Sequence, residues 1–273
     1  MSTTTLDAVG SPARPKERPT TSAAGRMKAL ARAELTLLGR NKSTMFTVLL
    51  LPSVLTASMY GTVSSIDLAK NGLNAGTVLL PGSLGFALLF ALYSPLVGIY
   101  VVRREELVLK RLRTGELRDW EILAGAALPA VLIALAQSAL LVVGCSLWLH
   151  VPPPGSWWLA VVGLLLGIAV MGALATATAA VTRTAEGAQV AVMPMMLLST
   201  AGSGLVVPLD MLPDKVAAVC DALPLTPVIQ LIRGAWTGGA GAGDVLRELL
   251  VMVVWTLIAV LVVRKRFRWE PRR

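Results

Sequence analysis

The chain has 273 residues, of which 55% are hydrophobic, and its mean hydropathy is +0.70. This composition excludes an ordinary soluble domain, and one histidine with two cysteines is too few for a metal cluster or a disulfide framework. The net charge of +9 is spread along the chain rather than gathered on one soluble face, so it does not call for a nucleic-acid partner.

The first 42 residues divide into a tail and a helix. Residues 1–25 are rich in Ser, Thr, Pro and Arg, which predicts a disordered tail. Residues 26–42 contain good helix formers, with Met27, Leu30 and Leu37 loosely on one side. We expect an amphipathic helix lying in the membrane interface, although a basic anchor with no further role would show the same pattern.

Six apolar runs follow, and each approaches the roughly 20 residues that a bilayer core requires. They are Ser43–Gly61, Thr77–Val102, Ile122–Leu149, Trp157–Thr182, Gly187–Val207 and Val245–Val263. None alternates as a barrel strand does. The sequence therefore predicts an all-α integral membrane protein with one six-span domain over 43–263 and a basic tail over 264–273.

Charge predicts the orientation of these spans. Of the 25 Lys and Arg residues, all but Lys70, Lys215, Arg233 and Arg247 fall on the side that holds both termini. Positive charge concentrates in cytoplasmic loops. We therefore expect a multi-pass plasma-membrane protein with both termini in the cytoplasm, where its basic residues also meet anionic lipid headgroups.

Several features predict how the spans pack. Pro81, Pro95, Pro129 and Pro194 fall inside predicted spans, where proline often marks a bend. Gly163 and Gly167 belong to a series of small residues that permits close helix packing, either within one chain or between two copies. Cys145 and Cys220 both fall toward the outer face, where they are either unpaired or bonded to each other.

The polar side chains inside the spans are mostly uncharged. No Asp, Glu, Lys or Arg lies near a span centre, so coupling to an ion gradient is poorly supported. No phosphate loop ends in Gly-Lys, and no Ser/His pair or carboxylate cluster suggests an enzyme, so no cofactor is expected. The remaining groups either make interhelical or core contacts or line an apolar pathway; these candidates are Gln137, Met193, Met196, Ser199, Thr200 and Ser203.

The segment 103–125, RREELVLKRLRTGELRDWEILAG, is an island of charge between two spans. Leucines and a valine interleave with its charges, which predicts a short helix with an apolar stripe. A plain connection between membrane helices has no need of such a stripe. We interpret the segment as a docking surface for a soluble partner.

The segment 208–239 lies on the opposite side and is divided by prolines into two apolar pieces, 215–223 and 228–236. Each is too short to span. We expect two short helices that dip into the interface or re-enter the membrane, serving either as a structural cap or as the gate of an exit.

Together these residues resemble the membrane subunit of type-2 ABC transporters, the permeases of bacterial ATP-driven exporters. The charged segment is similar to the family pattern at Arg104-Glu105-Glu106, at Leu109 to Arg113 and at Leu117, Trp120 and Gly125, but it has Leu107 where glycine is usual and Ala126 where lysine is common. The outer segment is similar at Pro208, Leu212-Pro213, Pro224, Thr226-Pro227 and Arg233.

The resemblance implies a non-catalytic permease that pairs with a second copy or a paralogue and binds a separate ABC ATPase subunit. It would move a hydrophobic or amphiphilic substrate, a drug-like molecule or a lipid, outward. The alternatives are a membrane receptor, a scaffold or an assembly factor without transport. The implied coupling residues are Arg103, Arg104, Glu105, Glu106, Leu109, Lys110, Arg111, Leu112, Arg113 and Glu116, and the implied outer gate holds Pro208, Pro213, Pro224 and Pro227.

Overall fold

The structure, a computed structural model, describes residues 25, 28–29, 32–33, 36, 42–64, 75–114, 118–205, 209, 212–238, 241–267 and 269. Among these residues every regular element is a helix, which confirms the all-α prediction. The elements are α2 (Lys42–Ser64), α3 (Ala75–Ala87), η2 (Leu88–Tyr93), α4 (Ser94–Glu105), α5 (Val108–Arg113), α6 (Asp119–Leu149), α7 (Trp157–Val181), α8 (Ala185–Ala191), α9 (Met193–Gly202), α10 (Asp214–Asp221), α11 (Thr226–Thr237) and α12 (Ala242–Arg266). Of the predicted interfacial helix 26–42, the structure describes only Lys28, Ala29, Arg32, Ala33, Thr36 and Lys42, and all six are helical.

Four helical stretches are long and apolar enough to cross a membrane. They are Ala75–Glu105, Asp119–Leu149, Trp157–Val181 and Ala242–Arg266. The pair α10 and α11 also passes as a unit, but it bends by 103° between its halves, as expected for the two outer pieces. Helix α2 covers the first predicted span but is not among the four helical stretches that are long and apolar enough to cross a membrane. The six crossings therefore stay a prediction.

The fifth predicted span, Gly187–Val207, is not one helix. It is divided at Val192 into α8 and α9, which have 7 and 10 residues. Pro194 lies in the first turn of α9, where its missing N–H and fixed φ are tolerated, whereas inside a continuous helix its ring would clash with the carbonyl of residue 190. The proline therefore explains the break.

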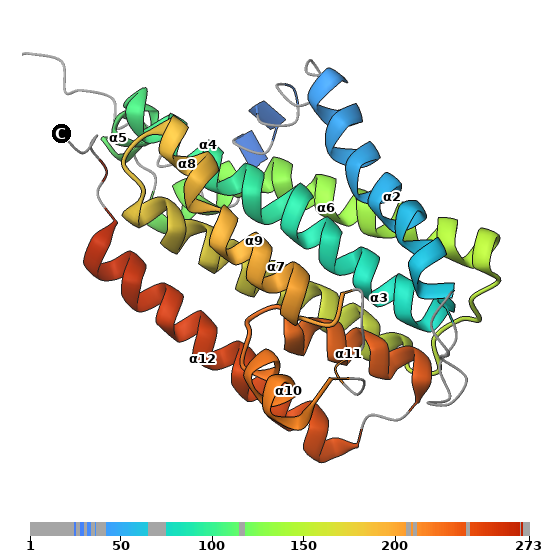
Figure 1. Ribbon diagram of the computed structural model, residues 1–273. Helices are drawn as coiled ribbons and strands as arrows, with labels where there is room; N and C mark the ends of the chain where they lie inside the picture. Colours follow the sequence, from blue (N-terminus) through green and yellow to red (C-terminus); the bar gives the residue numbers. More distant parts are fainter. Residues whose placement is uncertain are drawn as a thin grey trace, which may run out of the picture.

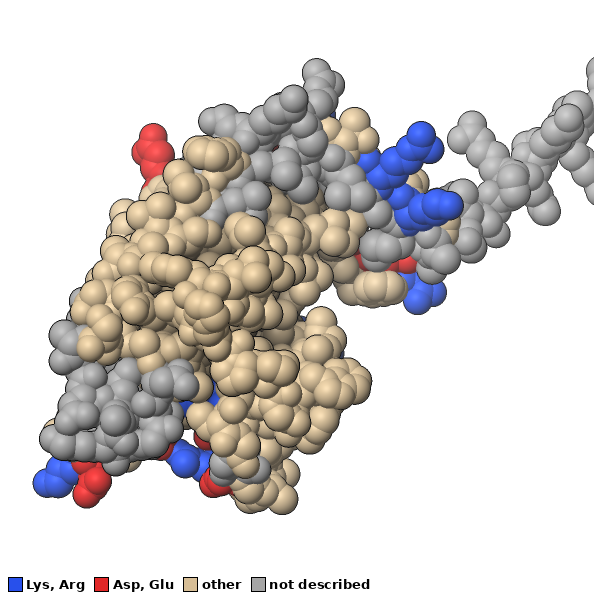
Figure 2. Space-filling view, turned by 90° about the vertical axis from the view of Figure 1, so that its right-hand side faces the viewer, with Lys and Arg blue, Asp and Glu red and all other residues tan. Residues whose placement is uncertain are grey.

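The helices run between two ends that differ in character (Figure 1). α5, α8 and the last turns of α12 lie at one end, which we call the α5 end. α10, α11 and the beginning of α12 lie at the other, the α11 end. Figure 2 shows that charged side chains gather toward the top and bottom of the molecule, with uncharged residues between them. The four long stretches likewise carry Asp, Glu, Lys or Arg only within about two turns of their ends.

A wide turn interrupts the second predicted span. Residues Leu88–Tyr93 form a π-helix, in which the N–H of Ser94 donates to the carbonyl of Leu89, five residues earlier. The next residue is Pro95, whose ring would crowd the carbonyl of Ala91 in a regular α-helix. The predicted proline bend is thus relieved by a π turn. This turn also directs the Tyr93 hydroxyl to within 3.0 Å of Thr178 Oγ1 on α7.

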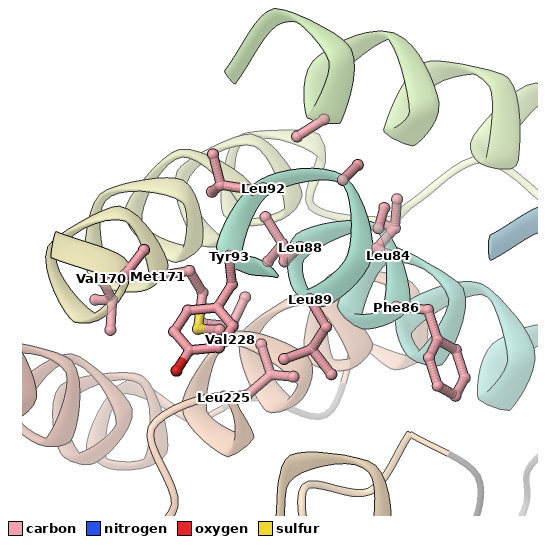
Figure 3. Packing of buried hydrophobic residues seen from close by; sticks show 14 of the residues in the cluster. Leu84, Phe86, Leu88, Leu89, Leu92, Tyr93, Val170, Met171, Leu225 and Val228 are labelled. Atoms are coloured by element: carbon pink, nitrogen blue, oxygen red, sulfur yellow. The ribbon is translucent and has the colours of Figure 1, made fainter. Parts of the chain in front are cut away.

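The core forms where α7, η2 and α11 meet (Figure 3). Leu88, Leu89 and Tyr93 from η2 pack near Met171 of α7 and Val228 of α11, and all five are buried. Burial of this apolar surface would stabilise any soluble core at about 25 cal/mol per Å². In a lipid environment close packing and hydrogen bonds replace that driving force, so small residues acquire a larger role.

Glycines on α3 and α7 make room for α11. A Cβ on Gly167 would approach Val228 Cγ1 to 2.6 Å, and one on Gly163 would approach Ile232 Cγ1 to 3.3 Å. For these two residues the alternative of packing within one chain is therefore confirmed. Gly85 plays the same part on α3, where an added Cβ would lie 2.6 Å from Ile229 Cδ1.

Gly82→Ala should lower the free energy of unfolding by about 2 kcal/mol, since overpacking typically costs 1–3 kcal/mol. The new Cβ would lie 2.0 Å from the backbone carbonyl oxygen of Leu205, which cannot rotate away as a side chain can. Gly98→Ala is the matched control, because nothing lies within 4 Å of its Cβ position. Unfolding in detergent would measure both, and equal stability of the two variants would refute the close contact.

Candidate functional site

The chain reverses direction between α4 and α5 at the α5 end. Leu107 adopts the left-handed conformation, with φ 60° and ψ 13°, and its N–H donates to the carbonyl of Arg104 at 3.1 Å. A side chain in this region places Cβ too close to the following carbonyl, a penalty that glycine avoids. The glycine usual in the resembled family at this position thus has a clear physical reason, and Leu107 departs from it under strain.

Leu107→Gly should raise the free energy of unfolding by about 1 kcal/mol, because it relieves that strain. The exposed leucine gives up little burial. Leu112→Gly, in the regular helix α5, should instead destabilise, since glycine is poorly suited to helix interiors. Unfolding midpoints in detergent would test the pair, and a lower midpoint for the Leu107 variant would show that the turn is not strained.

Arg104 points inward rather than toward solvent. Its guanidinium donates from Nη1 to the carbonyl of Ala179 at 2.9 Å and from Nη2 to the carbonyl of Thr182 at 2.5 Å, at the end of α7. The side chain is only 1% exposed. A cation at a helix C-terminus satisfies its last carbonyls and complements the negative end of its dipole. Arg104 therefore closes the end of α7.

Glu105 reaches the next helix along the chain. Its Oε2 accepts from the backbone N–H of Ala185 at 3.2 Å, in the first turn of α8. A carboxylate is favourable at a helix N-terminus, where N–H groups lack partners. Arg104 and Glu105 thus tie the end of α4 to both sides of the α7–α8 turn. We call this pair of contacts the α4 strut.

Helix α5 is anchored by one face and presents its charges on the other. Leu109 is fully buried and Leu112 is partly buried. The side chains of Glu106, Lys110 and Arg111 are exposed. The expected amphipathic helix is therefore present, although only as one and a half turns. Of the other coupling candidates, Arg103 is partly buried and Glu116 lies outside the described residues.

Three contacts at this end escaped the sequence analysis. Arg113 Nε lies 3.0 Å from Asp119 Oδ1, and its guanidinium carbon lies 4.9 Å from the centre of the Trp269 ring. Trp269 thus packs against the last residue of α5, while the predicted basic tail 264–273 is described only in part. Glu121 is fully buried and accepts the N–H of Arg118 at 2.8 Å, which caps α6. The sequence signal for this cap was a glutamate, Glu121, three residues after the residue that precedes the helix, Arg118.

The outer segment is packed down against the bundle. Pro224 and Pro227 are buried and Pro213 is exposed, whereas Pro208 lies outside the described residues. Arg233 is buried in α11 and donates from Nη2 to the carbonyl of Gly204 at 2.8 Å, just after α9. This hydrogen bond fixes the bent pair to the end of α9. Arg104 fixes α4 to the end of α7 in the same way.

The pathway candidates do not share one location. Gln137 is buried on α6, and its amide nitrogen lies 3.1 Å from Ser53 Oγ of α2. Ser199 and Ser203 are buried on or just after α9, and Ser199 bonds within α9 to Met195. Met193 is exposed, and Met196 and Thr200 are partly buried. The hydrogen bond of Gln137 to α2 matches the alternative of interhelical contacts.

Both cysteines, Cys145 and Cys220, are buried free thiols, which matches the alternative that they are unpaired.

A family model described as "ABC-2 type transporter" matches residues 26–236 of the chain. The matched range begins before α2 and ends in α11, so it contains α5, the α4 strut and the bent pair. No curated protein matches the chain.

Proposed function

Because the chain belongs to the ABC-2 type transporter family, a family of membrane transport proteins, we propose that it is the permease subunit of an ATP-driven exporter. A separate ABC ATPase subunit would supply the hydrolysis, and a second permease copy or a paralogue would complete the assembly. The observation that carries this proposal is the α4 strut beside an exposed, charged α5.

The geometry supports a mechanical role for this end. Exposed charges on Glu106, Lys110 and Arg111 suit recognition of a soluble partner, since such groups set register and partner choice. A displacement of α5 would move α4 through the turn at Leu107. The movement of α4 would then reach the α7–α8 turn through the contacts of Arg104 and Glu105. Rigid-body movement of packed helices is a common means of transmitting a switch.

The other end supports an exit. The bent pair α10 and α11 covers the end of α9, and α11 packs into α3 and α7. The outer faces of α9 and α2 expose large apolar residues, among them Leu197, Leu198 and Phe46, which suits contact with lipid and with a second permease. We place the outer gate at this cover, with Pro224 and Pro227 fixing its bend.

The chemistry of the spans supports the proposed substrate class. Their buried polar groups in the described residues are largely hydroxyls and one amide, such as Ser199, Ser203 and Gln137. Spread over several helices, these groups give the interior of the spans hydrogen-bonding capacity without fixed charge, and we propose the substrate class from this interior. A hydrophobic or amphiphilic molecule, a drug-like compound or a lipid, fits it better than an ion.

Orientation can be tested by labelling with an impermeant thiol reagent in intact cells. Cysteine placed at Lys215, on exposed α10, should react, whereas cysteine at Arg113 should react only after the cells are opened. Cys145 and Cys220 would first be replaced by alanine to remove the background. Labelling at position 113 from outside would invert the topology and remove the docking role of α5.

Co-purification tests the function itself. The proposed ABC ATPase subunit should be retained by the tagged permease in detergent. A receptor, scaffold or assembly factor without transport would leave the ATPase behind. The proposal fails if a folded permease retains none of it.

A further inference from the structure

A cleft of about 620 Å³ lies at the α5 end, between the beginning of α6 and the final turns of α7 and α12. Its apolar part includes Leu123, Ala173 and Val260, one from each helix. Its rim carries Trp120 and Arg264. The volume lies within the roughly 300–1,000 Å³ of small-molecule sites, which also combine an apolar lining with few polar groups. The cleft is separate from the α4 strut and from the pathway candidates.

The charges around the cleft favour an anion. Asp119 is the one carboxylate among its described lining residues, and Arg113 binds it at 3.0 Å. Arg264 makes no ion pair with a described residue, and it is followed by Lys265 and Arg266 in the last turn of α12. Among the described residues, Asp119 is thus neutralised and Arg264 is not. A negatively charged group at the rim would therefore be attracted.

The cleft also lies at the height expected of lipid headgroups. The predicted sixth span ends at Val263, directly before Arg264. Trp120 is 57% exposed at the rim, and Trp269 stands beside it on the C-terminal arm. Tryptophan is enriched at membrane–water interfaces, and basic pockets between helices on the cytoplasmic side suit anionic headgroups.

We propose that this cleft binds one anionic phospholipid of the inner leaflet. The phosphate would pair with Arg264, and one acyl chain would lie along Leu123, Ala173 and Val260. Such a lipid would fill the space between α6 and α12 and support the contact of Trp269 with Arg113 on α5. The inference relies on the proposed orientation of the chain but not on transport, and its test requires no ATPase.

Native mass spectrometry of the full chain in detergent tests the site, with phosphatidylglycerol and phosphatidylcholine as probes. The chain should retain one phosphatidylglycerol about tenfold more strongly than phosphatidylcholine. Arg264→Gln should weaken that retention about fivefold, the effect expected of one cation near an anionic headgroup. Lys265→Gln is the matched control: it lies in the same turn but does not line the cleft, and should change retention less than twofold.

Filling the cleft gives the second readout. Ala173→Leu should abolish tight retention of phosphatidylglycerol while the unfolding midpoint stays within a few degrees of the parent chain. If that variant is unstable, Val260→Phe fills the same space from α12. Equal retention of both lipids, equal losses for Arg264→Gln and Lys265→Gln, or unchanged retention in a stable filled variant would each overturn the proposal.

Discussion

A triple variant with Glu106→Lys, Lys110→Glu and Arg111→Glu should bind the partner ATPase roughly tenfold or more weakly and should export no substrate. All three side chains are exposed: Glu106 lies directly after α4, and Lys110 and Arg111 lie on α5. Like charges placed opposite each other at an interface cost several kcal/mol, so reversal should repel a complementary partner. Co-purification from membranes and binding measured at two salt concentrations would check the result.

The control reverses charge at the opposite end of the molecule. Asp214→Lys with Lys215→Glu alters two exposed residues of α10 and should leave ATPase binding unchanged. Both variants should insert into the membrane at parent levels, because no buried group is altered. If the triple variant retains the ATPase as well as this control does, α5 is not the docking surface.

Arg104→Ala should lower the free energy of unfolding by about 2–4 kcal/mol, through a mechanism internal to the chain. The change removes the donors to the carbonyls of Ala179 and Thr182 and leaves the end of α7 without its cap. Buried groups that lose a charged partner keep their full desolvation cost. Unfolding of the purified chain in detergent measures the loss.

Two substitutions make this result interpretable. Arg104→Lys keeps the charge but not the planar fork of donors, so it should fall between the parent and the alanine variant. Arg111→Ala removes an exposed arginine from the same segment and should change stability by no more than about 0.5 kcal/mol. Equal stability of the Arg104 and Arg111 alanine variants would show that the inward contacts are not stabilising.

The sequence predicts the helices that depend on length and apolarity alone. The third, fourth and sixth predicted spans match α6, α7 and α12 to within about three residues, and the two outer pieces match α10 and α11. These elements follow from local composition, which a single chain displays directly. The break at Val192 was harder to predict from the sequence, because Pro194 indicates a bend but does not determine whether the helix continues.

The α5 end shows where local reasoning stops. Arg104 and Glu105 belong to one charged motif, yet Arg104 is buried because carbonyls 75 or more residues away accept from it. Nothing in the motif separates it from the exposed Arg111. Trp269 likewise acquires its place from Arg113, a contact set by how α12 packs along α7. Such partners are decided by tertiary packing, which spacing in the sequence does not reveal.

The rate of ATP hydrolysis by the proposed partner ATPase, reconstituted in lipid vesicles with and without this chain, tests the central claim most directly. The account predicts that the chain changes this rate severalfold and that the Glu106, Lys110 and Arg111 triple reversal removes the change. A rate that is the same with the parent chain, the triple variant or no permease would contradict a role for this protein in ATP-driven transport.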